Sequence, residues 1–334
     1  MIGVGVVGAG HFGAVHARAL AGVEGARLVA ACRTDAEAAV RFAAEHGGTP
    51  YADWRALLDD SAVDAVVVAT PHHLHREVAV GALDAGRHVL LEKPMAATVA
   101  DCDAILAAAG RSAGRLMVGH VTRFFLPVQA AEAILASGEV GRPIAGLAAF
   151  AKPWMEPNRQ PWHLGRASGG GMLMTAGIHA LDRLVHLMGA PVGSVTAMMG
   201  AAFHDQEADD TAFLALRFAD GRMGQVTSLG LREGATTQPL HLACEGGILV
   251  LDDAGLRIGQ GGRWHAIDGP AEPDPMLGAL QRQWRAFLEA VAKGAEPPVG
   301  GAYGRHLVAV IEAADRASRD RREVAIEGAP DATA

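Results

Sequence analysis

The sequence predicts an α/β protein with a doubly wound parallel sheet in its N-terminal part and a second domain of the α+β class in its C-terminal part. Three observations support this fold class. The chain has 334 residues, which is enough for two domains of ordinary size. Short apolar runs alternate with helical segments over the first third of the chain. The later strands are punctuated by hairpin turns and are followed by helices.

In the first third, short apolar runs predict strands that are buried on both faces of a sheet. The expected strands are Gly3–Gly8, Arg27–Cys32, Ala65–Ala69, His88–Glu92 and Leu116–Gly119. The expected helices are His11–Ala21, Asp35–His46, Asp53–Leu58, Leu74–Ala85 and Val99–Ala109. Because strands and helices alternate, the sheet should be parallel, with helices on both of its faces.

The rest of the chain predicts helices grouped beside an antiparallel sheet. The expected strands are Ile144–Lys152, Ala212–Phe218, Arg222–Leu229, Leu240–Cys244 and Ile248–Leu251. The expected helices are Val128–Ser137, Gly171–Gly189, Gly278–Lys293 and Gly304–Arg319. We therefore divide the chain into residues 1–121 and 122–334, and leave open whether the C-terminal helices pack back on the first domain.

Composition narrows the class of partner. The net charge is −8 and the basic residues are scattered, so no nucleic acid is expected. The sequence has no apolar run long enough for a membrane span. The three cysteines are far apart in sequence, which argues against a disulfide framework or a thiolate zinc site and favours the cytoplasm. The acidic pair Asp209-Asp210 is expected to lie in a solvated turn.

The turn after the first strand has the pattern G-x-G-x-x-G. Gly8 would permit the tight turn, Gly10 would let a pyrophosphate approach the backbone, and Gly13 would let helix and strand pack closely. The free N–H groups at the start of the helix favour phosphate. We expect a Rossmann domain that binds NAD(P), with His11 and Phe12 also in contact with the cofactor; the alternative is merely a tight turn.

Arg33 and Thr34 follow the second strand, at the distance where an acidic residue would bind the ribose of NAD. An arginine there can pair with the 2′-phosphate of NADP. NADP is therefore favoured. Asp35 is either a helix N-cap or a ribose ligand, and it keeps NAD as the alternative.

Thr70, Pro71 and His72 follow the expected strand Ala65–Ala69, at an end where a doubly wound sheet faces its cofactor. We expect them, with His75, to contact the cofactor, although Pro71 can also simply end the strand. His72, His73 and His75 are crowded together. A metal site needs further ligands in a fixed geometry, so no metal is expected.

Glu92, Lys93 and Pro94 follow the next strand in the same way. Glu92 and Lys93 are expected to line the cofactor site. A lysine near a nicotinamide can bind the reacting hydroxyl and move its proton, because burial and nearby positive charge lower the pKa of an amine. The alternative for Lys93 is an ordinary surface lysine in a loop.

Further motifs extend along the chain. They are the Gly-rich turn, Glu92-Lys93-Pro94, Arg123-Phe124, Gly169-Gly170-Gly171 with Gly177-Ile178-His179 and Asp182, Asp210-Thr211-Ala212, and the helical ending from Gln283-Trp284 to Ala317. Together they resemble the Gfo/Idh/MocA family, the oxidoreductases similar to glucose–fructose oxidoreductase and inositol dehydrogenase. The resemblance covers nearly the whole chain.

The resemblance implies a second domain with a large, open, mostly antiparallel sheet that often packs against another subunit, hence a homodimer or homotetramer. It implies hydride transfer between NAD(P) and a hydroxyl or carbonyl carbon of a sugar, cyclitol or related small polar substrate. Lys93 falls on the catalytic lysine of the family, and His179 falls on its catalytic or substrate-orienting histidine.

One position departs from the family pattern. Many members have an aspartate four residues before the histidine, and here that residue is Thr175. A threonine hydroxyl can bind substrate but carries no charge, which argues against simple inositol or glucose oxidation. Asp182 shares a helix face with His179 and either binds substrate, orients the histidine or forms a structural ion pair.

Three further residues are candidates for binding substrate. Arg123 follows the last strand of the first domain, and it either contacts substrate or pairs with the other domain. Trp162 and His163 lie in a loop rich in aromatic and cationic groups, which suits a sugar or an anion but also an oligomer interface. Two rival functions stay open: a dehydrogenase of an aromatic dihydrodiol, and a non-catalytic regulatory protein of the same fold that binds the cofactor.

Overall fold

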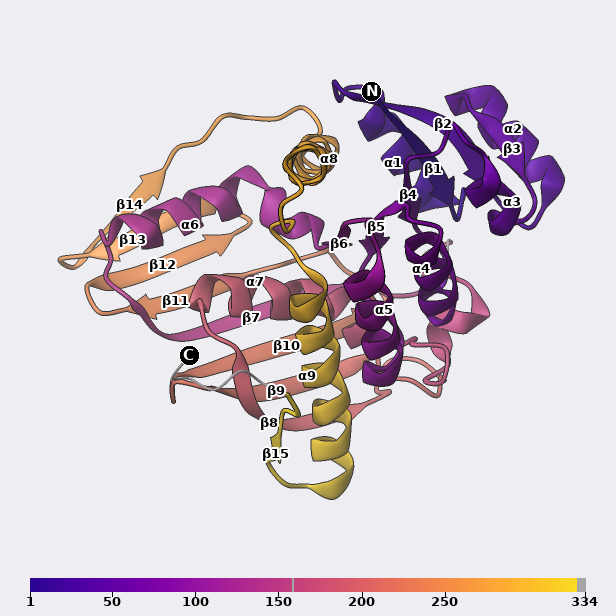
Figure 1. Ribbon diagram of the computed structural model, residues 1–334. Helices are drawn as coiled ribbons and strands as arrows, with labels where there is room; N and C mark the ends of the chain where they lie inside the picture. Colours follow the sequence, from indigo (N-terminus) through magenta and orange to yellow (C-terminus); the bar gives the residue numbers. More distant parts are fainter. Residues whose placement is uncertain (158, 329–334) are drawn as a thin grey trace. The chain divides into compact units, whose positions relative to one another are not determined.

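The computed structural model describes residues 1–157 and 159–328. The chain forms two compact units, which Figure 1 shows as ribbons. The first unit contains residues Met1–Phe124 and Glu272–Arg305, and the second contains Phe125–Ala271 together with the segment that begins at His306. Each unit has its own sheet, and each is described by itself.

The sheet of the first unit is six-stranded, in the order β3-β2-β1-β4-β5-β6, and all its strand pairs are parallel. The strands are β1 (Ile2–Val7), β2 (Ala26–Cys32), β3 (Thr49–Tyr51), β4 (Ala65–Val68), β5 (His88–Glu92) and β6 (Leu116–Gly119). The helices between them are α1 (His11–Leu20), α2 (Ala36–His46), α3 (Trp54–Asp59), α4 (His75–Asp84) and α5 (Val99–Arg111), with the 3-10 turns η1 (His72–Leu74) and η2 (Val121–Phe124). The predicted doubly wound parallel sheet is confirmed.

The central strands of this sheet are apolar because both of their faces are covered. Every residue of β4 is fully buried, and β1 is buried from Gly3 onward. The strand order reverses between β1 and β4, and a crevice at such a reversal is where doubly wound sheets bind ligands. The short edge strand β3, which contains Pro50, escapes prediction because its residues are mostly exposed.

Residues 272–305 belong to the first unit, although the sequence division ends the first domain at residue 121. They include α8 (Pro275–Lys293) and the start of α9 (Gly301–Asp320). The physical reason is a set of contacts with the first sheet and its helices. The Trp284 indole donates to His16 on α1 at 3.1 Å, and Val118 in β6 donates to the Val299 carbonyl at 2.9 Å.

The sheet of the second unit is nine-stranded, in the order β14-β13-β12-β11-β7-β10-β9-β8-β15. Its strands are β7 (Pro143–Pro153), β8 (Val192–Gly200), β9 (Thr211–Phe218), β10 (Met223–Leu231), β11 (Leu240–Cys244), β12 (Gly247–Asp252), β13 (Gly255–Gln260), β14 (Arg263–Ile267) and β15 (Val324–Ala325). Its helical elements are α6 (Leu126–Ser137), α7 (Ile178–Met188), the 3-10 turn η3 (Pro161–Leu164), the π-helical turn η4 (Leu173–Gly177) and most of α9. Pairing is antiparallel except between β7 and β10, which confirms a mostly antiparallel sheet.

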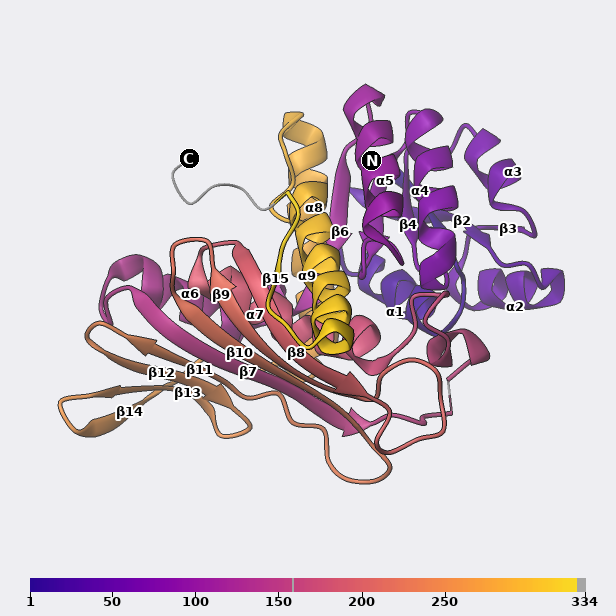
Figure 2. The ribbon, with the colours of Figure 1, turned by 90° about the horizontal axis from the view of Figure 1, so that it is seen from below.

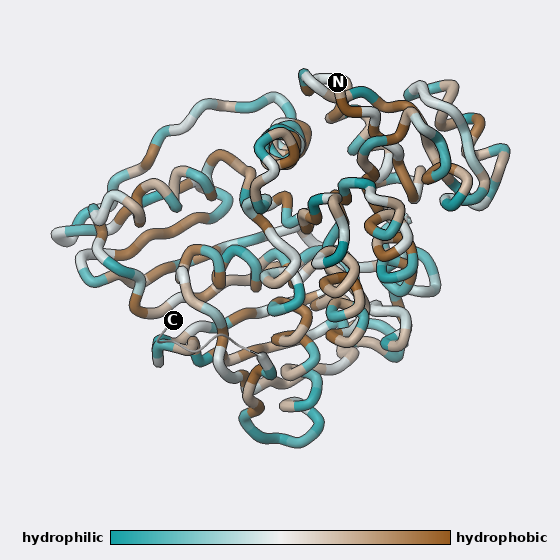
Figure 3. The backbone as a smooth tube through the Cα atoms, viewed as in Figure 1, coloured by the Kyte–Doolittle hydropathy of each residue, from teal (hydrophilic) through white to brown (hydrophobic). Residues whose placement is uncertain are grey.

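The two faces of this sheet differ. Helices α6 and α7 lie on one side of it (Figure 2). Burial alternates along β9, where Leu214 and Leu216 are buried, whereas Phe213 and Ala215 are exposed. Figure 3 colours these strands by hydropathy, and hydrophobic residues recur along them. Sheets with this pattern pack one face on a core and leave the other open.

The helix predicted over Gly171–Gly189 is two elements. It begins as the π-helical turn η4 and continues as α7. A Cβ on Gly177 would lie 2.3 Å from the Ser228 hydroxyl oxygen of β10, so this position packs directly against the sheet. Such π-helical turns interrupt α-helices frequently at functional sites. Among the described helices, none combines the length and apolar character that crossing a membrane requires.

Candidate active site

The Gly-rich turn has the geometry that a dinucleotide needs. Gly8 has φ of +96°, and a Cβ on it would lie 2.5 Å from the Ala69 carbonyl carbon at the end of β4. A Cβ on Gly13 would lie 2.4 Å from the Gly8 carbonyl oxygen, so only glycine lets α1 pack this close to the turn. A Cβ on Gly10 would meet nothing within 4 Å, which leaves room for a phosphate.

Helix α1 begins directly after this turn. Its N-cap, Gly10, provides no side-chain cap, so backbone N–H groups of the first turn are available to an anion. His11 is exposed, and the ring of Phe12 packs edge-on against His16 at 5.3 Å. Both residues lie where a cofactor contact is predicted, and that contact stays a prediction.

Arg33 leaves the end of β2 toward the Gly-rich turn. Its Nη1 lies 3.5 Å from the Ala9 carbonyl oxygen, and both Arg33 and Thr34 are exposed. The Asp35 carboxylate accepts the Ala38 N–H at 3.0 Å and caps α2. Two roles were considered for Asp35, helix N-cap and ribose ligand, and the structure shows the helix N-cap. The Arg33 guanidinium is exposed, and its predicted contact with the 2′-phosphate of NADP stays a prediction.

Thr70, at the end of β4, also suits a bound dinucleotide. Its hydroxyl oxygen is buried and has no hydrogen-bond partner among the described residues. A Cβ on Gly8 would lie 2.8 Å from the Thr70 nitrogen, so the two segments touch. A buried hydroxyl without a partner is costly, and a bound dinucleotide would supply one. Pro71 follows, half-buried, ahead of η1.

His75 is held by backbone carbonyls of two loops, and its predicted contact with the cofactor stays a prediction. Its Nδ1 lies 2.8 Å from the Pro94 carbonyl oxygen, and its Nε2 lies 2.9 Å from the Thr70 carbonyl oxygen. The ring is 1% exposed, and burial lowers the pKa of His75. Because the protein's own backbone occupies both ring nitrogens, His75 ties two loops together. His72 is also buried, with its ring 5.6 Å from that of His75.

Lys93 stands on a buried carboxylate. Glu92 Oε1 accepts from His16 Nε2 at 2.9 Å, and Glu92 Oε2 accepts the Lys93 backbone N–H at 3.2 Å. Gly119 of the neighbouring strand leaves room for this side chain, since a Cβ there would lie 2.7 Å from Glu92 Oε1. Glu92 therefore holds the backbone of Lys93. Its predicted contact with the cofactor stays a prediction.

In the second unit, His179 lies in the first turn of α7, directly after the π-helical turn that contains Thr175. The imidazole lies 5.9 Å from the ring of Phe150 on β7, at an interplanar angle of 32°. Thr175 is buried and His179 is half-buried. The sequence spacing of these two residues therefore places them on consecutive turns of one helical segment.

Asp182 has no exposed surface. Its neighbour Arg183 is also buried and donates to the carbonyl oxygens of Gln238 at 3.0 Å and Ala149 at 3.5 Å. Burial lowers the pKa of Arg183 to about 10, and the Asp182 carboxylate opposes that shift. The burial of Asp182 beside the buried Arg183 favours a structural ion pair over direct contact with substrate.

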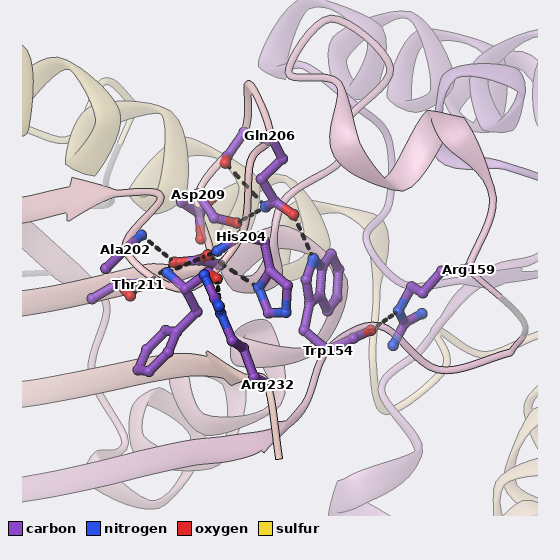
Figure 4. A network of polar contacts seen from close by, with 11 residues as sticks. Trp154, Arg159, Ala202, His204, Gln206, Asp209, Thr211 and Arg232 are labelled. Atoms are coloured by element: carbon purple, nitrogen blue, oxygen red, sulfur yellow. Dashed lines mark hydrogen bonds and ion pairs between the residues drawn. The ribbon is translucent and has the colours of Figure 1, made fainter.

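The loop with the aromatic and cationic residues is held by its own contacts. The rings of Trp162 and His163 stack at 3.6 Å, and Trp154 meets His163 edge-on at 6.3 Å. Trp154 donates its indole N–H to Gln206 at 2.8 Å, and Arg159 donates to the Trp154 carbonyl at 2.7 Å (Figure 4). His163 is buried in this cluster, so packing accounts for it at least as well as a substrate contact does.

The acidic pair Asp209-Asp210 is buried, which corrects the expected solvated turn. Asp210 accepts the backbone N–H groups of Ala202, Phe203 and His204 (Figure 4). Asp209 Oδ2 accepts the Leu173 N–H at 2.8 Å and so holds the start of η4. Burial raises the pKa of Asp209 to about 6. Local sequence cannot distinguish this pair from an exposed one.

Arg123 belongs to the first unit, and its guanidinium carbon lies 3.9 Å above the ring of Tyr303. Its predicted contact with substrate stays a prediction. Sequence reasoning gave no role to Tyr303 or His16, and it named Trp284 only as part of the helical ending of the chain. Lys93 belongs to the first unit, whereas Thr175 and His179 belong to the second.

Comparison with known proteins supports the reading of both units. Residues 2–120 match an oxidoreductase family with an NAD-binding Rossmann fold, and residues 128–250 match the GFO/IDH/MocA C-terminal domain. The 2,7-anhydro-N-acetylneuraminate hydratase of Mediterraneibacter gnavus is 35% identical over 228 residues, which are 66% of this chain and 59% of that protein. The 1,5-anhydro-D-fructose reductase of Ensifer adhaerens is 32% identical over 204 residues, which are 60% of this chain and 61% of that protein.

Both matches thus span less than two thirds of the relative's own length. Over the whole chain, the crystal structure of GenD2 from gentamicin A biosynthesis, in complex with NAD, is similar with a TM-score of 0.87 and 25% identity. That match covers 98% of this chain and 97% of the other. Because the two family models match the two units in order, this chain belongs to the Gfo/Idh/MocA family of oxidoreductases.

Proposed function

We propose that the protein is an NAD(P)-dependent oxidoreductase that interconverts a hydroxyl and a carbonyl group on a small polar molecule. The observation that carries the proposal is Lys93, which follows β5 of an NAD-binding Rossmann fold and is supported by a buried carboxylate. The strand ends of such a sheet face the cofactor. A lysine in that place is suited to proton transfer at the reacting oxygen.

The bound nicotinamide supplies or accepts the hydride. The residues of the chain bind the cofactor and the substrate and move the proton. The Gly-rich turn and the start of α1 bind the pyrophosphate through backbone N–H groups. The Lys93 amine binds the reacting oxygen and gives or takes its proton, and His179 assists at the substrate. Thr175 positions a hydroxyl of the substrate without adding a charge.

The substrate class rests on the relatives and on Thr175. Two relatives are named for anhydro sugars, a hydratase of 2,7-anhydro-N-acetylneuraminate and a reductase of 1,5-anhydro-D-fructose. An uncharged residue one turn before His179 suits a polar, neutral group. We therefore favour a sugar, an anhydro sugar or a related cyclitol. 1,5-Anhydro-D-fructose with reduced cofactor is the first substrate to test.

Replacement of Lys93 tests the function. We expect Lys93→Met to lower kcat for reduction of 1,5-anhydro-D-fructose, or of whichever polar carbonyl compound wild type turns over, by about 100-fold or more. NADH and NADPH should bind to it as to wild type. Lys293→Met is the matched control, because Lys293 is exposed and pairs with Glu289. Full turnover by Lys93→Met would rule out the proposed role.

The preferred cofactor is NADP, and the support is the exposed Arg33 guanidinium beside the Gly-rich turn. GenD2, in contrast, is described in complex with NAD. Titration of nicotinamide fluorescence with NADPH and NADH decides between them. We expect tighter binding of NADPH, and a loss of about 10-fold or more in NADPH affinity for Arg33→Asp. Tighter binding of NADH by wild type would overturn the preference and leave the oxidoreductase proposal standing.

Thr175 also supports a second candidate, a regulatory protein that binds the cofactor without turning it over. A dehydrogenase of an aromatic dihydrodiol is a third, with the same residues in the same roles. Binding of NADPH without oxidation by any sugar or diol ketone would favour the regulator. Turnover with a dihydrodiol and none with sugars would favour the third.

Two further proposals concern the setting of the enzyme. The outward face of the nine-stranded sheet exposes large apolar side chains, which supports a homodimer or homotetramer formed through that sheet. Cys32 is a buried free thiol, and burial raises the pKa of Cys32 to about 11. A buried thiol in its protonated form supports a location in the reducing cytoplasm.

A further inference from the structure

A line of three buried side chains connects helix α8 to the backbone of Lys93. Trp284 on α8 donates its indole N–H to His16 Nδ1 at 3.1 Å. His16 Nε2 lies 2.9 Å from Glu92 Oε1, and Glu92 Oε2 accepts the Lys93 N–H at 3.2 Å. Trp284 and His16 are fully buried, and Glu92 is 5% exposed. All of these residues lie in the first unit.

The chemistry of the indole fixes the proton positions along this line. An indole nitrogen only donates, so His16 Nδ1 is the acceptor. In a neutral imidazole the proton must then be on Nε2, which donates it to the carboxylate of Glu92. Trp284 thus selects one tautomer of His16 and occupies the nitrogen that would otherwise accept a second proton.

The surroundings leave little freedom to the three side chains. The ring of Trp284 meets that of His16 edge-on at 5.8 Å, and the ring of Phe12 also meets it edge-on, at 5.3 Å. Glu92 fits against Gly119, where a Cβ would lie 2.7 Å from its Oε1. The packing and the hydrogen bonds therefore both favour a single arrangement of Trp284, His16 and Glu92.

We propose that Trp284 and His16 are positioning residues for Lys93. By fixing one tautomer of His16, the indole leaves the negative charge on Glu92, the residue before the lysine, and Glu92 fixes the lysine's backbone. This inference rests on the proposed function in one respect, that Lys93 is the working amine. The segment 272–305 would then belong to the catalytic apparatus of the first unit as well as to its core.

The charged and titratable groups around this line come from four elements. They are His16 on α1, Glu92 on β5, Lys93 in the turn after β5, and His75 on α4, whose charge interacts with those of both Glu92 and Lys93. Trp284 on α8 adds no charge. A change at Trp284 therefore alters the electrostatics of the site only through His16.

The wild-type protein tests the first step. Nitrogen-15 NMR of the histidine rings distinguishes a protonated ring nitrogen from an unprotonated one. We expect His16, assigned by loss of its signals in His16→Phe, to show an unprotonated Nδ1 and a protonated Nε2. A proton on Nδ1 would contradict the tautomer and with it the proposal.

The second test uses the small number of lysines. The sequence has three, Lys93, Lys152 and Lys293, so trace acetylation with acetic anhydride followed by peptide mass spectrometry reports Lys93 against two internal references. Trp284→Phe removes the N–H and keeps an aromatic ring. Phe287→Leu is the matched control, because Phe287 is buried on the same helix, next to Trp284, and belongs to no polar chain.

In Trp284→Phe, His16 Nδ1 is free to accept a proton, and the imidazolium offsets the charge of Glu92. A carboxylate stabilises the protonated form of a nearby amine, so Lys93 should acetylate about threefold faster or more at pH 7 relative to Lys152 and Lys293. Phe287→Leu should leave this ratio unchanged. Equal ratios in the two variants would overturn the proposal, as would slower labelling in Trp284→Phe.

These measurements need no substrate and separate the two hypotheses. If wild type binds no NADPH or NADH, or Lys93→Met turns over normally, the proposed function fails whatever the NMR and labelling show. If Lys93→Met is inactive but Trp284→Phe labels like Phe287→Leu, the proposed function stands and the positioning role fails.

Discussion

At the residue scale, two glycines of the same motif should respond to alanine in opposite ways. A Cβ on Gly13 would lie 2.4 Å from the Gly8 carbonyl oxygen and 3.0 Å from a methyl carbon of Val6. We expect Gly13→Ala to lower the free energy of unfolding by about 1–3 kcal/mol, because the overpacked backbone must shift. A Cβ on Gly10 would meet nothing within 4 Å.

Gly10→Ala should therefore keep its stability and lose affinity for NADH or NADPH by about 10-fold, because the methyl group occupies space meant for the pyrophosphate. Urea denaturation and nicotinamide fluorescence measure the two effects. If Gly10→Ala lost stability like Gly13→Ala, or bound cofactor like wild type, the assignment of the open space to a phosphate would be wrong.

Single residues also mark where sequence reasoning ends. The roles of Gly8 and Gly13 could be predicted because a turn and its helix are local. The roles of His75 and Glu92 could not, because their partners lie far along the chain: Pro94 for His75, and His16 for Glu92. The residue type shows whether a side chain can donate or accept a hydrogen bond. Only the fold determines which residue is its partner.

At the scale of the element, the π-helical turn that precedes His179 should depend on pH through Asp209. The ordinary pKa of this carboxyl is 3.8, and burial raises it to about 6. Between these values the folded protein binds more protons than the unfolded chain, so stability falls as pH rises from about 4 to about 6. Above pH 6 both states are ionised, and the folded state carries the full cost.

We expect Asp209→Asn to remove this slope, because an amide oxygen can still accept the Leu173 N–H but has no charge to bury. At pH 7 the variant should be more stable than wild type, by about 3 kcal/mol at most. Urea denaturation from pH 4 to pH 8 measures this difference. Asp205→Asn, an exposed position of the same loop, should leave the curve unchanged. Parallel curves for Asp209→Asn and wild type would refute the prediction.

How well an element could be predicted depended on how local its cause is. The strands β1, β4 and β5 could be predicted because they are apolar runs. The hairpin of β9 and β10 could be predicted from Asp220 and Gly221 at its turn. Strands β8, β13 and β14 were not predicted. The π-helical turn was also missed, because it arises from contacts with Asp209 and with β10 that helical periodicity does not reveal.

At the scale of the whole molecule, the division of the chain was the least predictable feature. The segment Glu272–Arg305 joins the first unit through tertiary contacts such as that of Trp284 with His16. Its sequence shows an amphipathic helix but not the surface that the helix covers. The parallel pairing of β7 with β10 inside an otherwise antiparallel sheet likewise depends on which strands lie next to each other in the fold. Periodicity defines strands and helices, whereas packing assigns them to units.

The open face of the nine-stranded sheet should be the surface through which copies of the chain associate. Leu147, Met198, Phe213 and Met223 are 43%, 71%, 40% and 59% exposed on neighbouring strands, and they border a hollow of about 730 Å³. Met198 lies directly opposite Phe213 in the ladder of β8 and β9. Apolar groups gathered in this way usually mark an interface.

Two charges at the centre of this face should therefore separate the copies. By size-exclusion chromatography with light scattering, we expect wild type to be a dimer or tetramer and Met198→Glu combined with Phe213→Glu to be a folded monomer. Two facing carboxylates oppose each other and would each lose water in an interface. Val40→Glu, at a 55% exposed position on α2, should leave the mass of the assembly unchanged. An unchanged mass for the double variant would place the interface elsewhere.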